Sequence, residues 1–196
     1  MRPRVILAAI LVALVQTGAI AAIIANRAVH IAYGREIVLD VVPVDPRDLL
    51  RGDYVRLNYP ISRLNGDIVE FPEHPYKDMP IFVTLEHQGK PGEEKWVAVA
   101  ASAVRPSLAG SDSKIVLQGR FQWSWSHRDR RTGENRQGMS IRYGIETYFV
   151  PESTGRDLEK LTRKGAVKTI VSVDRNGKAA IKGIIVEGVR HEESLL

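Results

Sequence analysis

Residues 167–186, VKTIVSVDRNGKAAIKGIIV, contain two runs in which apolar residues recur at alternate positions, joined by the segment DRNGK at 174–178. An Asn-Gly pair between two such runs is a strong sequence signal for a tight β-hairpin. The stretch therefore predicts strands over residues 167–173 and 179–186 that pair antiparallel.

Similar strand patterns occur along most of the chain before this hairpin. They cover residues 36–44, 53–59, 80–86, 95–104, 114–126 and 139–150. Only residues 154–164 have a helical pattern, with Leu158 and Leu161 three apart and Gly165 as a C-terminal stop. Eight strands with one short helix predict a mainly β domain, either an antiparallel β-sandwich or an open barrel.

The N-terminal segment at residues 5–25, VILAAILVALVQTGAIAAIIA, is long enough to be a transmembrane helix. Arg2 and Arg4 precede it, and the next cations are Arg27 and Arg35, so the positive-inside rule places the N-terminus in the cytoplasm. A cleaved signal peptide is the alternative, although its apolar region is ordinarily shorter.

We therefore expect a single-pass protein of the cytoplasmic (inner) membrane with a periplasmic or extracytoplasmic domain. The expected division is a membrane anchor at 1–27, a juxtamembrane linker at 28–35 and a β-rich domain at 36–196. About 165 residues follow the anchor, enough for one domain with a core of its own.

Composition narrows the possible functions. The chain has no cysteine, which excludes thiol catalysis and Cys-ligated metals, and its five histidines lack the spacing of common metal motifs. The formal net charge of +5 is a mild excess, and the basic run at residues 127–136 reads as a solvated hairpin loop. We expect no metal, no cofactor and no nucleic-acid partner.

Gly-Asp-Tyr-Val-Arg-Leu-Asn-Tyr at residues 52–59 is the most distinctive motif. Strand alternation places Asp53, Val55, Leu57 and Tyr59 on one face, and Val55 and Leu57 make that face apolar and inward. Tyr54 would point to the opposite face. Gly52 would form a tight turn before the strand.

This motif fills every fixed position of the pattern G-D-Y-x-x-L-x-Y. Residues 142–152, RYGIETYFVPE, are similar to a second segment, YGIE-x-YFVPE, associated with the same family. On these segments the chain resembles the GDYXXLXY protein family. The resemblance implies a membrane-anchored bacterial protein whose biochemical role is unassigned.

Two interpretations of these segments remain open. In the structural one, Gly52 forms a turn, Asp53 accepts backbone amides, the tyrosines pack in the core, and Glu146 pairs with Arg142 or Arg56. In the functional one, Gly52, Asp53, Tyr54, Leu57, Tyr59 and Glu146 belong to a binding site, or Asp53 and Glu146 form a carboxylate pair like that of a glycosidase.

The aromatic residues Phe121, Trp123 and Trp125 share one face by their spacing, and core packing explains them more simply than a sugar-binding platform. No nucleophile or cofactor motif is present, so the sequence assigns no catalytic residue. It favours a non-catalytic accessory or binding protein of the cell envelope, held in the lipid bilayer by residues 5–25 and associated with a polytopic membrane protein. The alternative is an envelope hydrolase with its site around Asp53 and Glu146.

Overall fold

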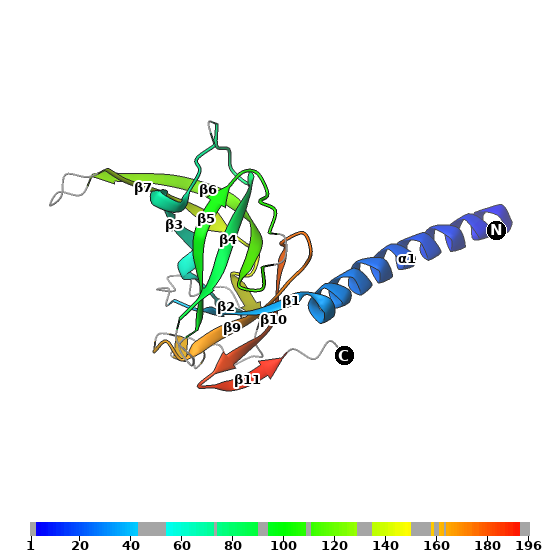
Figure 1. Ribbon diagram of the computed structural model, residues 1–196. Helices are drawn as coiled ribbons and strands as arrows, with labels where there is room; N and C mark the ends of the chain where they lie inside the picture. The colour runs from blue at the N-terminus through cyan, green and yellow to red at the C-terminus, as the bar shows by residue number, and fades with distance from the viewer. Residues whose placement is uncertain are drawn as a thin grey trace.

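The computed structural model describes residues 3–42, 54–72, 74–89, 94–108, 111–128, 135–149, 158, 161–162 and 164–192. One helix, α1 (Pro3–Tyr33), leads into a domain of antiparallel strands (Figure 1). The strands are β1 (Arg35–Asp40), β2 (Tyr54–Arg56), β3 (Arg63–Asn65), β4 (Pro80–Gln88), β5 (Lys95–Ser102), β6 (Lys114–Arg128), β7 (Asn135–Arg142), β8 (Thr147–Phe149), β9 (Val167–Val173), β10 (Ala179–Val186) and β11 (Val189–Glu192). Two short 3-10 helices, η1 (Pro60–Ser62) and η2 (Gly66–Ile68), flank β3.

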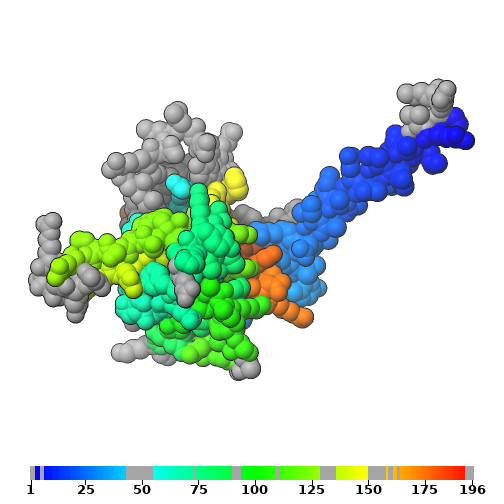
Figure 2. All heavy atoms as spheres, turned by 90° about the horizontal axis from the view of Figure 1, so that it is seen from above, coloured from blue at the N-terminus to red at the C-terminus, as the bar shows by residue number. Residues whose placement is uncertain are grey.

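Helix α1 has 31 residues and is therefore about 46 Å long. Its segment Leu7–Tyr33 has a mean hydropathy of 2.4 and none of its most apolar window is buried in the domain. Figure 2 shows this helix projecting from the domain with its side chains uncovered. A helix that is apolar all round and covered by no protein is a candidate membrane span. It stays helical through most of residues 28–35, the stretch expected to be a linker.

Two large sheets enclose the core. One has the strand order β3-β7-β6-β4-β5 and the other β1-β9-β10-β11, and β2 and β8 form a separate pair. The core takes side chains from both large sheets, among them Leu39 and Val171 from one and Val83 and Leu117 from the other. The described strands make antiparallel sheets that do not close into a barrel, which confirms the predicted fold class.

The predicted hairpin at 167–186 is confirmed, since β9 and β10 pair antiparallel over their whole lengths with one irregularity near Lys182. Gly177 adopts a φ of +84° in the turn, a conformation that glycine accepts more easily than other residues. The Gly177 carbonyl also accepts the Gln118 amide at 2.7 Å. The turn of one sheet is thereby bonded to a strand of the other.

The sequence patterns missed short elements and extended several strands beyond their observed ends, such as 53–59 for β2 and 95–104 for β5. Strands β3 and β11 and both 3-10 helices were not predicted. The strand expected at 139–150 is two strands, β7 and β8, separated by a turn at residues 143–146. The expected helix at 154–164 lies mostly outside the described residues, where Leu158, Leu161 and Thr162 are helical.

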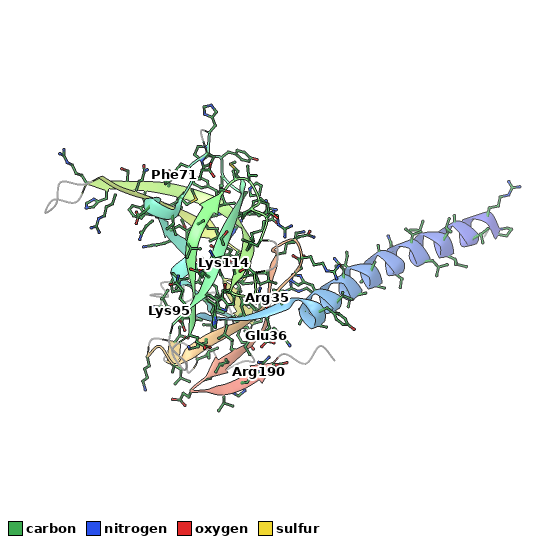
Figure 3. All side chains as sticks on the ribbon, viewed as in Figure 1. Arg35, Glu36, Phe71, Lys95, Lys114 and Arg190 are labelled. Carbon is green, nitrogen blue, oxygen red and sulfur yellow. The ribbon has the colours of Figure 1, made fainter. Side chains whose placement is uncertain are left out.

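The unpredicted strand β11 is tied to the first strand by charge. Arg190 donates two hydrogen bonds to the carboxylate of Glu36, each of 2.8 Å, and Figure 3 labels both residues. Lys182 donates a further one of 3.0 Å. The hydrogen bonds from Arg190 lower the pKa of Glu36 and outweigh the opposing effect of burial. The cluster joins β1, β10 and β11 on one surface of the sheet.

Candidate functional site

The two family-like segments, far apart in the sequence, are neighbours in the structure. Strand β2 pairs with β8, placing Val55 opposite Tyr148 and Arg56 opposite Thr147. The ladder is extended by a hydrogen bond of 3.0 Å from the Leu57 amide to the Glu146 carbonyl. The two segments therefore form one unit, here called the motif pair (residues 54–61 and 143–149).

The inward face of the first segment agrees with the predicted alternation. Val55, Leu57 and Tyr59 are buried, and Arg56 is exposed. Gly52 and Asp53 lie outside the described residues, and only the backbone of Tyr54 is described. The expected roles of these three residues, and a pairing of Asp53 with Glu146, therefore stay predictions.

Two buried tyrosines hold the motif pair together reciprocally. The Tyr59 hydroxyl donates to the Ile145 carbonyl at 2.7 Å, and the Tyr143 hydroxyl donates to the Ile61 carbonyl at 2.8 Å. Each segment thus donates one side-chain hydrogen bond to the backbone of the other. Burial raises the pKa of both tyrosines above the usual range, so both hydroxyls remain protonated donors at neutral pH.

Glu146 does not form the ion pair that the sequence suggested. Its two carboxylate oxygens accept the backbone amides of Tyr143 at 2.5 Å and Gly144 at 2.9 Å. Arg142 instead binds Asp78 at 2.9 Å, and the described residues include no ion pair of Glu146 with Arg56. The pairing prediction is therefore wrong: the carboxylate closes the turn between β7 and β8, where it compensates two amides that have no ladder partner.

The turn also changes which side chains face inward. Ile141, Tyr143 and Ile145 are buried as the alternation predicts, but Thr147 and Phe149, expected on the same face, are exposed. The turn at 143–146 is not extended strand, and the period of two is lost between Ile145 and Thr147, where the turn leads into β8.

An analogous break separates the three aromatic residues of β6. The pairing with β7 shifts between Phe121 and Trp123, the signature of a β-bulge. Phe121 is 5% exposed and Trp123 is 47% exposed, so they do not share the core face. Trp125 is half-buried and lies against Gly138. Core packing is confirmed for Phe121 and is wrong for Trp123.

A pocket of about 480 Å³ adjoins the turn of the motif pair. Its lining includes Arg120, Arg142, Lys178, Glu146, Gln118 and Thr147, drawn from β6, β7, β8 and the β9–β10 hairpin. Sequence reasoning selected only Glu146 among these as a site residue. The sequence signal for the others is weak, because single cations at strand ends are common on solvated surfaces. Among the described residues, no three His, Asp or Glu side chains come together as a metal site.

The architecture defines a class: an antiparallel β-domain carried on a single N-terminal apolar helix that is a candidate membrane span. The chain belongs to the GDYXXLXY family, since the family model described as "GDYXXLXY protein" matches residues 16–184. Neither a curated protein nor a solved structure matches the chain.

Proposed function

We propose that this protein is a membrane-anchored binding subunit of the cell envelope whose β-domain contacts an integral membrane partner. Its N-terminus lies in the cytoplasm, and the domain lies on the outer side of the cytoplasmic membrane. The observation that carries the proposal is the direct, hydrogen-bonded junction between the apolar helix and the domain.

The junction fixes the domain relative to the helix. The His30 carbonyl accepts the Gly34 amide at 3.0 Å and the Ser172 hydroxyl at 2.8 Å, and the His30 ring is 3.2 Å from the Ser172 carbonyl. These bonds leave little freedom between α1 and β9. A domain held in this way presents a defined surface to a neighbouring membrane protein.

The motif pair supports a binding role through its outer side. Its buried tyrosines and Glu146 are engaged in holding the two segments together. Among its described residues the exposed side chains are Arg56, Pro60, Thr147 and Phe149, and Phe149 is 74% exposed. A large aromatic residue beside an arginine is a combination enriched in the centres of protein interfaces.

The hydrolase alternative has one observation in its favour, since Glu146 lines the 480 Å³ pocket. A glycosidase needs two carboxylates across its scissile bond. Glu146 is the only acidic residue among the described residues of that lining, and its oxygens already accept two amides. The binding subunit is therefore the better supported function.

Co-purification from native membranes tests the proposed partner. We expect the tagged full-length chain, extracted in mild detergent, to carry a stoichiometric polytopic membrane protein. Phe149→Ser and Arg56→Glu should reduce the recovered partner at least about tenfold, as expected for interface residues whose loss costs more than about 1.4 kcal/mol. Val189→Ser is the matched control, since Val189 is a 58% exposed apolar residue on β11.

Each variant must first melt at the wild-type temperature, so that a lost partner reports on the surface. A partner that remains with both motif variants would contradict the assigned surface. Recovery of the chain alone from wild-type membranes would contradict the subunit role.

Labelling of a single introduced cysteine tests the orientation. The natural chain has no cysteine, so Ser126→Cys, at an exposed site on β6, is the sole thiol. We expect a membrane-impermeant maleimide to label it in cells whose outer membrane has been permeabilised but whose inner membrane is intact. Met1 followed by an inserted cysteine should be labelled only after lysis. The opposite pattern would place the domain in the cytoplasm.

A further inference from the structure

Two arginines stand directly opposite each other at the edge of the 480 Å³ pocket. Arg120 on β6 is the register partner of Arg142 on β7. Like charges in this position destabilise an antiparallel pair. This part of the sheet therefore contains a charge repulsion that an uncharged or oppositely charged pair would not produce.

Asp78 holds these arginines in place with one carboxylate and one carbonyl. Its Oδ1 accepts Arg142 at 2.9 Å, and its backbone oxygen accepts Arg120 at 3.0 Å. Asp78 itself adopts a φ of +66°, which is uncommon for a residue with a side chain. Its amide is bonded to the Phe121 carbonyl at 2.8 Å, which fixes this backbone against β6. Asp78 thus holds two guanidinium groups, one through its carboxylate and the other through its carbonyl.

A third cation reaches the pocket from the other sheet. Lys178 lies in the β9–β10 turn, and its amide is bonded to Asp174 Oδ1 at 2.8 Å. The bond between Gly177 and Gln118 holds this turn beside β6. For the Lys178 ammonium group, the described part of the chain shows no ion pair. Three cations thus line the pocket with one carboxylate, Glu146, whose oxygens accept two backbone amides. Asp78, outside the lining, pairs with Arg142, so three cations face two carboxylates and a positive excess remains.

We propose that this pocket, lined by Arg120, Arg142 and Lys178, binds a phosphate group. Guanidinium groups present paired N–H donors that match phosphate oxygens, and a lysine supplies a compact positive charge. The volume of about 480 Å³ is large enough for a phosphate with a small organic substituent. A phosphate group has three strong acceptor oxygens and can bind more than one cation, whereas a carboxylate has only two oxygens.

The location of the pocket relative to α1 allows two sources of phosphate. The turn carrying Lys178 lies beside the C-terminal end of α1 (Figure 1), and β9 is bonded to His30 through Ser172. His30 is one helical turn, about 6 Å, beyond Asn26, where the apolar segment ends. Lipid headgroups occupy roughly 5–8 Å on each side of the hydrocarbon core. At this depth the phosphate can be that of a lipid headgroup, and a pocket open to solvent can also take a soluble phosphate compound. The site does not depend on the protein partner proposed above.

Titration with inorganic phosphate tests the site itself. The full-length protein is kept in a phosphate-free, uncharged detergent at constant ionic strength, and binding is followed by calorimetry. We expect saturable binding that Arg120→Gln or Lys178→Gln weakens about tenfold to a hundredfold, as expected when a charge-assisted hydrogen bond is lost. Lys164→Gln is the control, because Lys164 is exposed and does not line the pocket.

The melting temperatures of the three variants without phosphate establish that each is folded. Binding that is absent in the wild type, or that is weakened equally by Lys164→Gln, would overturn the proposal. Repeating the titration in phosphatidylglycerol nanodiscs then separates the sources. Loss of phosphate binding there assigns the pocket to lipid headgroups, because they occupy it already, and unchanged binding assigns it to a soluble phosphate. Both results keep the phosphate site.

Discussion

Replacement of Tyr59 by alanine should lower the free energy of unfolding by about 3–5 kcal/mol, the usual cost of removing a buried aromatic ring. Tyr59 is 1% exposed and lies in the core, where its hydroxyl is 3.4 Å from Thr169 Oγ1 on β9. The substitution removes the ring and also leaves the Ile145 carbonyl without this donor. Urea unfolding of the detergent-solubilised protein, followed by near-UV circular dichroism, measures the change.

The two tyrosine hydroxyls provide the matched controls. Tyr59→Phe keeps the ring and should cost only about 1–2 kcal/mol, and Tyr143→Phe should cost a similar amount. Because both hydroxyls join the same two segments, the double variant should differ from the sum of the single ones. A Tyr59→Ala variant as stable as the wild type would show that this tyrosine does not hold the fold together.

The sequence was most informative where one local rule governs a whole element. The alternation at 167–173 and 179–186, with Asn176-Gly177 between, predicts both strands, and the structure has the same bounds. The apolar run at 5–25 likewise predicts the helix, which continues beyond it because residues 26–33 contain no helix-breaking proline or glycine. In each case the deciding residues are contiguous.

The sequence was least informative where one residue changes the register. The residue types around Phe121 and Trp123 do not indicate the β-bulge between them. The bulge places Trp123 on the opposite side from the one that strict alternation predicts. The Glu146 carboxylate likewise closes a turn at residues 143–146, and the strand-like sequence on either side does not indicate that turn. The cations of the pocket come from β6, β7 and the β9–β10 turn, and only the three-dimensional fold brings them together.

Replacement of Gly34 by alanine should destabilise the junction between helix and domain by about 1–3 kcal/mol, the usual cost of overpacking a tight site. A Cβ at this position would lie 2.1 Å from Ser172 Oγ, 2.8 Å from the His30 carbonyl oxygen and 3.0 Å from that of Val173. Two of these atoms are backbone, so the methyl group must displace α1 from β9. Limited proteolysis near residue 34 and the urea midpoint of the full-length protein measure this displacement.

A second substitution identifies the cause of that destabilisation. Ser172→Ala removes the nearest atom, Ser172 Oγ. Gly34→Ala should therefore lower the free energy of unfolding less in the Ser172→Ala background than in the wild type. Part of the destabilisation should remain, because the two carbonyl oxygens are still present. Gly18→Ala, within α1, is the control, because its Cβ would meet nothing within 4 Å. If Gly34→Ala leaves proteolysis and the urea midpoint unchanged, helix and domain are not held by this contact. The constrained presentation of the domain, on which the proposed subunit role rests, would then lose its physical basis.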